Sequence, residues 1–488
     1  YNLSLGFRIY PKYLNVVEGI FLKIMMLRLF HHYIPTSIVW LILVEFLVLI
    51  FSVYLGIEIR FFDGEYDKAR LAPYFPKALL FALAMWFSMT AMGLHTRNVV
   101  DDYPGLLIRL ILSFGVGFLG STFLFYVFPG LFFGRGVLAI SMIVAFVWIL
   151  IIRIIFFKLT RHRLFKRRIL VLGVGSRAKI LRDMDSDFRD RGHNIVGYVK
   201  GNDSHVDIPE EDILSIETTL VDLVLDNKID EIVLAMDDRR QGFPVSGLLE
   251  CKMSGIQIRD IVHFLERVTG HIELEVLHPS VMIFSSGFTK AVSPGNGKRL
   301  FDIFASLIIL VLASPVIILT AIVIWLSSFG GAPVLYKQTR IGLSNVPFEV
   351  MKFRSMRVDA EKNGAQFAKQ KDSRVTFIGA FIRKTRIDEL PQLFNVLMGD
   401  MSFIGPRPER PEFVLGFEQD IPHYSLRHTV KPGITGWAQI CYPYGDTLQD
   451  TRNKLQYDLY YIKNYSLFLD MTILFQTVQV VLFGQGAR

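Results

Sequence analysis

The first third of the chain is dominated by four long apolar stretches that contain almost no charge. They cover residues 38–55, 77–94, 106–128 and 137–157. About 20 consecutive apolar residues in a helix are enough to cross the roughly 30 Å hydrocarbon core of a bilayer. The pattern therefore predicts a membrane protein in which residues 36–158 form a bundle of four transmembrane helices, preceded by an N-terminal interfacial segment over residues 1–35.

A fifth apolar stretch, residues 300–326, differs because Ser314 and Pro315 lie in its middle. Proline removes a backbone hydrogen bond and clashes with the preceding turn. Basic residues flank the stretch on both sides, and a straight span would carry one of these clusters across the membrane. We therefore expect residues 296–328 to form a re-entrant helix, broken at Ser314-Pro315, that enters and leaves on the cytoplasmic face. A kinked true span is the alternative, since membrane helices tolerate proline.

Between these membrane segments, short β-rich runs alternate with helical stretches over residues 166–290, as in "RRILVLGVG" and "DEIVLAMDD". This alternation predicts a Rossmann-like α/β domain with a parallel sheet. Gly173, Gly175 and Ala178 form a G-x-G-x-x-A pattern between a strand and a helix, where a dinucleotide phosphate can bind. Because no acidic residue follows at the usual spacing, we favour a structural or regulatory domain, with a redox or dehydratase enzyme as the alternative.

The remaining residues, 329–488, alternate helical segments with Pro-Gly and Gly-Pro turns and predict an α-rich cytoplasmic domain. Its last apolar segment, "SLFLDMTILFQTVQVVLFG", is interrupted by Asp470, Gln476 and Gln479. Such an interrupted segment spans a membrane poorly. We expect a C-terminal amphipathic helix that lies on the membrane surface.

Charge sets the orientation of the helices in the membrane. Seven basic residues and no acidic residue lie at and beyond the end of the fourth apolar stretch, between residues 153 and 168. Short basic loops stay on the cytoplasmic side, so the rest of the chain is expected to be cytoplasmic. The chain has 488 residues, 51% of them hydrophobic, a mean hydropathy of +0.38 and a net charge of +8. No nucleic-acid motif accompanies this charge, which suits anionic lipids and phosphorylated substrates.

The two cysteines and an acidic residue within the first apolar stretch also bear on the prediction. Cys251 and Cys441 are the only cysteines, so the sequence indicates neither a disulfide framework nor a cysteine metal site. Glu45 lies in the middle of the first predicted span, where an acidic residue is costly and needs a partner. We expect Glu45 to pair with Arg109 or with another subunit, or to be protonated at a helix interface.

The segment "TRIDELPQLFNVL", residues 385–397, contains the adjacent carboxylates Asp388 and Glu389. Asp is a preferred N-cap and Pro is tolerated in a first turn, so we expect a helix to begin at Asp388. Leu390, Leu393, Phe394 and Leu397 would form its apolar face. Adjacent helical residues point about 100° apart, which implies different tasks: one carboxylate attacks while the other holds a divalent ion such as Mg²⁺. Taken in isolation, the pair is better explained as an ordinary helix start with an acidic first turn, because acidic caps are common.

The basic residues near this pair favour a functional site over an ordinary helix start. Arginine matches phosphate oxygens in a bidentate manner, and a dense basic set beside a broken membrane helix suits a pyrophosphate substrate that meets a lipid phosphate. The candidate phosphate-binding residues are Lys352, Arg354, Arg383, Arg386, Arg407, Arg410 and Lys431.

Several blocks of residues 298–484 closely resemble the bacterial polyprenyl-phosphate sugar-1-phosphate transferases, which initiate exopolysaccharide synthesis. The blocks include "LYKQTRIG", "KFRSMRVDAE", "RKTRIDELPQLFNVLMGDMSFIGPRPERPEF", "KPGITGWAQI" and "KLQYDLYYIKNYSL". The four apolar stretches and the Rossmann-like domain resemble the large members of that family. One departure is Asp372-Ser373-Arg374, where relatives commonly have Asp-Pro-Arg.

The resemblance implies roles for individual residues. Asp388 matches the nucleophile that attacks the β-phosphate of a UDP-sugar, releases UMP and forms a phosphosugar-aspartyl intermediate. Glu389 matches the Mg²⁺ ligand. Lys352, Arg354 and Arg407 match phosphate-binding positions, and Ser314-Pro315 matches the break of the re-entrant helix.

The sequence thus predicts a phosphoglycosyl transferase of the bacterial inner membrane that transfers a sugar 1-phosphate from a UDP-sugar to undecaprenyl phosphate by a ping-pong mechanism. A membrane scaffold for polysaccharide assembly with a degenerate transferase is a further alternative. We expect membrane lipids as partners, a homodimer, and no nucleic acid. The sequence does not indicate which sugar is transferred.

Overall fold

The computed structural model describes most of the chain. The described residues are 26–29, 32–62, 74–95, 103–161, 166–190, 192–201, 205–216, 219–238, 243–285, 287–288, 296–328, 331–360, 373–443, 445 and 447–483. The predicted interfacial segment over residues 1–35 falls mostly outside these ranges, apart from the short strands β1 (Met26–Leu29) and β2 (His32–Pro35). The Asp372 position of the departing motif also lies outside them.

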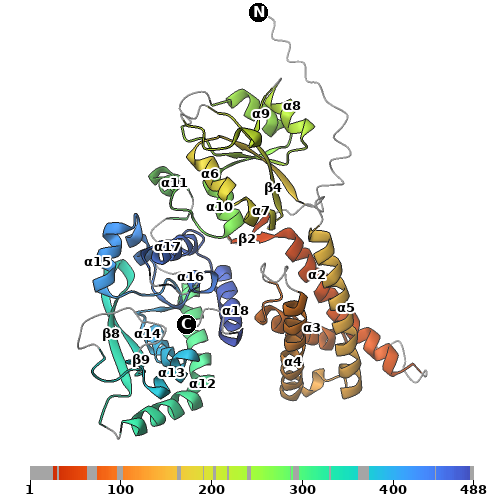
Figure 1. Ribbon diagram of the computed structural model, residues 1–488. Coiled ribbons are helices and arrows are strands. Elements are labelled where there is room, and N and C mark those ends of the chain that lie inside the picture. Colours follow the sequence, from red (N-terminus) through yellow and green to blue (C-terminus); the bar gives the residue numbers. More distant parts are fainter. Residues whose placement is uncertain are drawn as a thin grey trace, which may run out of the picture. The chain divides into compact units, whose positions relative to one another are not determined.

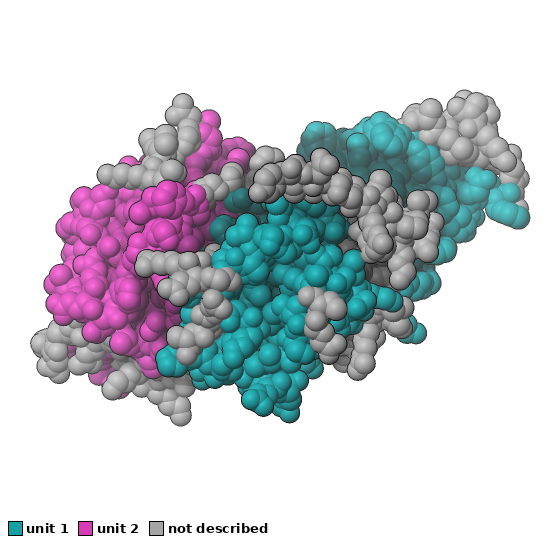
Figure 2. Space-filling model, turned by 90° about the horizontal axis from the view of Figure 1, so that it is seen from above, with its two compact units in different colours: residues 1–28, 33–89, 97–268 teal, residues 29–32, 90–96, 269–488 magenta. Residues whose placement is uncertain are grey.

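The chain divides into two compact units, which Figure 2 distinguishes by colour. Unit 1 comprises residues 1–28, 33–89 and 97–268, and unit 2 comprises residues 29–32, 90–96 and 269–488. The expected end of the Rossmann-like domain at residue 290 is therefore too late. Ile272, Leu274 and Leu277 instead belong to the hydrophobic core of unit 2, because their side chains pack against helices of that unit.

Helices form at each of the four N-terminal apolar stretches, as predicted (Figure 1). They are α2 (Thr36–Arg60), α3 (Phe75–Ala91), α4 (Tyr103–Val127) and α5 (Arg135–Arg161). Among the described residues, α2, α4 and α5 are long and apolar enough to cross a membrane, and α3, with 17 residues, is shorter.

A buried ion pair joins two of these helices. Glu45 of α2 and Arg153 of α5 lie 2.7 Å apart, and their side chains are 0% and 1% exposed. The expected pairing of Glu45 with Arg109 is therefore wrong. In the sequence, Arg153 is one of the basic residues at the end of the fourth stretch. It lies close to Glu45 because α2 and α5 pack against each other.

The Rossmann-like domain contains a five-stranded parallel sheet in the order β5-β4-β3-β6-β7. The strands are β3 (Arg167–Leu172), β4 (His193–Val199), β5 (Ile213–Leu214), β6 (Glu231–Leu234) and β7 (Gln257–Asp260). The connecting helices are α6 (Ser176–Asp183), α7 (Asp185–Asp190), α8 (Leu220–Asp226), α9 (Val245–Met253) and α10 (Ile261–Thr269). This arrangement confirms the predicted parallel α/β domain.

Unit 2 combines two small sheets with a helical core. The antiparallel hairpin is β8 (Leu335–Ile341) and β9 (Pro347–Phe353), and the parallel pair is β10 (Ser402–Ile404) and β11 (Gly433–Thr435). The helices are α11 (Pro279–Phe284), α12 (Asn296–Ser327), α13 (Phe377–Lys384), α14 (Gln392–Met398), α15 (Pro411–Asp420), α16 (Trp437–Cys441), α17 (Leu448–Lys463) and α18 (Leu467–Phe483).

Helix α12 contains the fifth apolar stretch. The helix continues through Pro315 without interruption, whereas we expected a helix broken at Ser314-Pro315. Figure 1 shows that the ribbon of α12 changes direction along its length. Proline is a common cause of such a bend. Ser314 Oγ donates a hydrogen bond to the Val311 carbonyl, 2.8 Å away, one turn earlier.

Both ends of α12 are anchored in unit 2. Near its start, the buried Lys298 donates to Asp470 at 2.8 Å, and Asp302 accepts from the backbone of Phe403. Near its end, Ile324 packs with Phe353 and Ile382 in a separate apolar cluster. Asp470 is fully buried, so this part of α18 faces the protein.

The Glu45 ion pair generates a stability prediction. Removing one partner of a buried pair leaves an uncompensated charge and costs about 3–5 kcal/mol. We expect Glu45→Gln to lower the unfolding temperature of the purified protein in detergent, and the double variant Glu45→Leu with Arg153→Met to recover most of the loss. Glu58→Gln, at an exposed position of the same helix, is the control and should change little. Equal losses in all three variants would contradict the assignment.

Candidate active site

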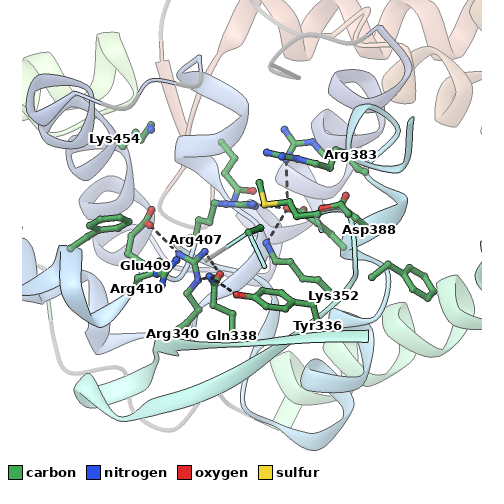
Figure 3. A pocket seen from close by; sticks show the side chains of 18 of the residues that line it. Tyr336, Gln338, Arg340, Lys352, Arg383, Asp388, Arg407, Glu409, Arg410 and Lys454 are labelled. Carbon is green, nitrogen blue, oxygen red and sulfur yellow. Dashed lines mark hydrogen bonds and ion pairs between the residues drawn. The ribbon is translucent and has the colours of Figure 1, made fainter. Parts of the chain in front are cut away.

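A cavity of about 470 Å³ in unit 2 contains most of the predicted site residues. Its walls come from the β8–β9 hairpin, the segment between α13 and α14, the loop after β10, and α15 to α17. Figure 3 shows Asp388 and Arg383 on one side, Lys454 on the other, and Arg407 between them. The predicted residues that line it are Lys352, Arg354, Arg383, Arg386, Asp388, Glu389, Arg407 and Arg410.

The carboxylate pair lies on a 3₁₀ turn rather than at a helix start. Asp388 and Glu389 belong to η9 (Ile387–Glu389), and α14 begins only at Gln392, so the predicted start at Asp388 is wrong. The turn follows Arg386, whose backbone is left-handed at φ 59°. A non-glycine residue in this region is strained, and such strain often accompanies functional sites.

The buried face of α14 also differs from the predicted one. Leu393 is buried, but Phe394 is 43% exposed, and the other buried side chains of the helix include Gln392, Asn395 and Val396. Asn395 explains this orientation. Its Nδ2 donates to the Glu349 carbonyl at 2.7 Å and its Oδ1 accepts from the Met351 amide at 3.0 Å. Asn395 thus joins α14 to strand β9 and brings η9 beside Lys352.

Lys431 does not line the cavity. Its Nζ donates to the Gly399 carbonyl at 2.7 Å, at the end of α14. Arg299 donates to the carbonyls of Val396 and Leu397 at the same helix end. Cations stabilise the carboxyl end of a helix, so Lys431 holds the scaffold of the site, whereas the sequence placed it with the phosphate-binding residues.

Arg407 is presented by a loop whose backbone is fixed at four successive residues. The carbonyls of Pro406 and Glu409 accept from the backbone N–H groups of Gly433 and Ile341, respectively. The carbonyls of Arg407 and Pro408 accept from the side chains of Arg427 and Arg340, respectively. A Cβ on the preceding Gly405 would lie 2.4 Å from the Lys431 carbonyl oxygen, so only glycine allows this close approach. The loop therefore holds the Arg407 side chain with little conformational freedom.

Arg427 supports this loop from a buried position. It donates to the Arg407 carbonyl at 2.8 Å and to the Tyr424 hydroxyl, and it forms an ion pair with Asp458 at 3.0 Å. Burial raises the pKa of Asp458 to about 6 even though Arg427 opposes the shift. Nothing in the sequence around Arg427 distinguishes it from a solvated arginine, so sequence reasoning missed this residue.

Glu389 is surrounded by cations. Its Oε1 accepts from Arg407 Nη2 at 2.5 Å and lies 3.8 Å from both Lys352 Nζ and an Arg386 Nη atom. Burial alone would raise the pKa of Glu389, but the positive charges of Arg407 and Lys352 outweigh burial and hold this pKa well below its ordinary value. Glu389 therefore stays ionised and neutralises part of the basic cluster.

Asp388 has the opposite electrostatic character. Burial, and then the charge of Glu389, raises the pKa of Asp388 to about 6. Its Oδ1 is buried and has no hydrogen-bond partner among the residues that the structure describes. A carboxylate oxygen without donors is poorly solvated and is therefore a better nucleophile than one in water.

The carboxylates fit a divalent ion only if a substrate supplies further oxygens. Across the described residues there is no group of three or more His, Cys, Asp or Glu side chains that could hold a metal. Mg²⁺ typically binds through one or two carboxylates together with substrate phosphates. The buried Oδ1 of Asp388, together with the neighbouring Glu389 carboxylate, fits that kind of site.

In the Rossmann-like domain, a carboxylate of the protein itself occupies the place where the glycine pattern predicted a phosphate. Asp237 accepts hydrogen bonds from the amides of Ser176 and Arg177, at 2.9 and 3.1 Å, where α6 begins. A Cβ on Gly175 would lie 2.1 Å from this carboxylate. Phosphate binding at a helix start uses these same amides, so Asp237 occupies the place that the G-x-G-x-x-A pattern suggested for a dinucleotide.

Two family models match the chain. Residues 294–484 match a family described as bacterial sugar transferase, and residues 90–259 match one described as a CoA-binding domain. The first match covers the cavity and α12. The second covers the sheet whose glycine loop contacts Asp237.

Several named relatives match part of the chain. The chain is 46% identical over 243 residues to the UDP-N-acetylgalactosamine-undecaprenyl-phosphate N-acetylgalactosaminephosphotransferase of Aeromonas hydrophila, covering 49% of this chain and 56% of that protein. It is 46% identical over 183 residues to the UDP-glucose:undecaprenyl-phosphate glucose-1-phosphate transferase of Escherichia coli (strain K12), covering 37% and 39%. The chain thus spans about half the length, or less, of these relatives.

A shorter relative is matched almost completely. The exopolysaccharide production protein PSS of Rhizobium leguminosarum bv. phaseoli is 44% identical over 187 residues, which are 92% of that protein and 37% of this chain. The matched region therefore makes up almost the whole of that relative.

The pKa of Asp388 predicts how stability depends on pH. The folded value of about 6 lies above the value of about 3.9 for an unfolded aspartate. The folded state therefore binds the proton more tightly, and the free energy of unfolding falls as the pH rises from about 4 to 6. We expect Asp388→Asn to raise the unfolding temperature at about pH 7.5, and this gain to disappear below about pH 4.

The control for this measurement is Asp400→Asn, at an exposed position after α14, which should shift the unfolding temperature little at any pH. A lower unfolding temperature for Asp388→Asn at neutral pH would show that ionised Asp388 stabilises the fold, contrary to this interpretation.

Proposed function

The chain belongs to the family of bacterial sugar transferases, and we propose that it transfers a sugar 1-phosphate from a UDP-sugar to undecaprenyl phosphate through a covalent intermediate on Asp388. The observation that carries this proposal is the contrast between the two adjacent carboxylates. Asp388 is buried with an unpartnered oxygen and a raised pKa, whereas Glu389 is held ionised by cations. The names of the relatives, which include a UDP-sugar or its sugar and undecaprenyl phosphate, support the two substrates.

The proposed first step is a displacement at phosphorus. A carboxylate oxygen of Asp388 attacks the β-phosphorus of the UDP-sugar, and the bond from this phosphorus to the bridging oxygen breaks. The electron pair leaves with UMP. In the second step an oxygen of the lipid phosphate attacks the same phosphorus, the bond to Asp388 breaks, and the carboxylate is regenerated.

Positive charge in the cavity favours this chemistry, because a pyrophosphate and the leaving phosphate both carry negative charge. Arg407 and Lys352 lie beside Glu389, and Arg383 lies beside Asp388 in Figure 3. Fixed cations in a water-poor site stabilise charge as it develops. Glu389 would hold Mg²⁺ together with the substrate phosphates, and the bound ion would supply further positive charge there.

The two-step order follows from in-line displacement. UMP must leave on the side of the phosphorus opposite Asp388, and the lipid phosphate must later attack from that same side. One anion site can serve both groups only if they occupy it in turn. We therefore propose a ping-pong sequence in which UMP departs before the lipid phosphate binds.

Helix α12 supports delivery of a lipid substrate. A straight helix of its 32 residues would be about 48 Å long, yet both of its ends contact unit 2. Its middle exposes apolar side chains such as Val311, Leu312 and Leu319. We propose that α12 enters the inner membrane and returns to the cytoplasmic face, where unit 2 receives undecaprenyl phosphate from the inner leaflet.

Labelling tests the covalent step. Incubation with a UDP-sugar labelled in the β-phosphate, without lipid, should transfer the label to the protein, and mass spectrometry should locate it on Asp388. Asp388→Asn should abolish labelling and product formation, with Asp400→Asn as the control that keeps both. If Asp388→Asn still transfers the label to the lipid, the covalent mechanism is wrong, and if the wild type releases no UMP, a scaffold role is favoured.

The pH dependence of the first step tests the protonation states. Protonated Asp388 cannot attack, so kcat/KM should fall about tenfold per pH unit below about 6. Burial lowers the pKa of Lys352 to about 8, so kcat/KM should fall again above that pH as the ammonium charge is lost. Lys352→Arg keeps its charge and should extend the upper plateau. An unchanged upper limb in this variant would exclude Lys352 as the group responsible.

A further inference from the structure

We infer that Gln439 of α16 recognises the base of the nucleotide donor, by hydrogen bonds to the edge of a pyrimidine such as uracil. This inference rests on the proposed function, because it concerns the part of the same cavity in which the nucleoside of the UDP-sugar would bind.

The direction of displacement fixes where the nucleoside lies. The leaving UMP must depart opposite to the attacking Asp388 oxygen. Figure 3 shows Asp388 and Lys454 on opposite sides of the cavity, with Arg407 between them. A pyrophosphate held at Arg407 would therefore direct its nucleoside toward the wall near Lys454.

That wall is formed by α16 and α17, which pack against each other. Five polar side chains of this region line the cavity, and Gln439 is one of them. Asp458 forms the ion pair with Arg427, and three others are also engaged. Lys454 donates to the Gly445 carbonyl at 2.5 Å, Tyr442 donates to Asp450 at 3.0 Å, and Thr451 donates to the Thr447 carbonyl at 3.1 Å. The remaining polar side chain is that of Gln439.

The Gln439 amide has an unused donor. Its Nε2 is buried and has no hydrogen-bond partner within the described part of the chain. A buried donor without a partner costs about 1–3 kcal/mol, so a ligand that accepts from it recovers this cost. The amide offers a donor beside an acceptor, which is complementary to the O4 acceptor and the N3–H donor of uracil.

Helix α16 holds this amide rigidly. Trp437 at its start donates from Nε1 to the Gly270 carbonyl at 2.8 Å and stacks on Tyr460 with ring centroids 5.8 Å apart. The backbone N–H of Gln439 donates to the Gly436 carbonyl at 3.0 Å, which fixes the backbone from which the side chain extends. A recognition residue on such an element can discriminate between ligands, because little ordering is required when the ligand binds.

Binding of UMP and ribose 5-phosphate by calorimetry tests the assignment, because the two ligands share a sugar and a phosphate and differ in the base. We expect Gln439→Leu to weaken UMP binding about tenfold to a hundredfold and to leave ribose 5-phosphate binding unchanged. Gln449→Leu, at an exposed glutamine of α17 that bonds Asn453, should change neither affinity. Retained ribose 5-phosphate binding shows that the variant is folded.

A size-matched variant sharpens the test. Glu offers only acceptors at neutral pH, so Gln439→Glu keeps the acceptor for the uracil N3–H but loses the donor to O4, and it should weaken UMP binding more than ribose 5-phosphate binding. Unchanged UMP affinity in Gln439→Leu, or parallel losses of UMP and ribose 5-phosphate, would overturn the role of Gln439 while leaving the proposed transferase intact. Failure of the wild type to bind UMP would overturn the proposed donor as well.

Discussion

Cations around Glu389 are the interaction on which the site depends, because they allow two adjacent carboxylates to be buried together. Arg407 and Lys352 keep Glu389 ionised, and the charge of Glu389 in turn contributes to the raised pKa of Asp388. One carboxylate is thus a fixed counter-charge while its neighbour is poorly solvated and reactive. Two isolated carboxylates in water would have neither property.

The rest of unit 2 can be understood as a frame for this arrangement. Asn395 joins α14 to β9, Arg299 and Lys431 hold the end of α14, and Arg427 fixes the loop that presents Arg407. The same frame anchors both ends of α12. The elements proposed to deliver a lipid and those proposed to hold phosphate are therefore parts of the same compact unit, as the proposed reaction at the membrane surface requires.

The sequence predicted long-range features better than local ones. Apolar length alone located the N-terminal helices, and the spacing of motifs located Asp388 and Glu389. The 3₁₀ turn was not predictable, because it depends on the left-handed Arg386 and on packing of Asn395. Lys431 and Glu45 were misjudged for a shared reason: their partners, Gly399 and Arg153, come from other elements that only the fold brings close. Gln439 gave no signal because a single glutamine is common on helices.

Isotope exchange tests the covalent account most directly, because it requires the first step to be complete and reversible on its own. Labelled UMP is incubated with unlabelled UDP-sugar and the wild-type protein in the complete absence of lipid phosphate. The account predicts that label enters the UDP-sugar, since UMP can attack the phosphosugar on Asp388 and regenerate the donor. Exchange that occurs only when undecaprenyl phosphate is present would contradict it.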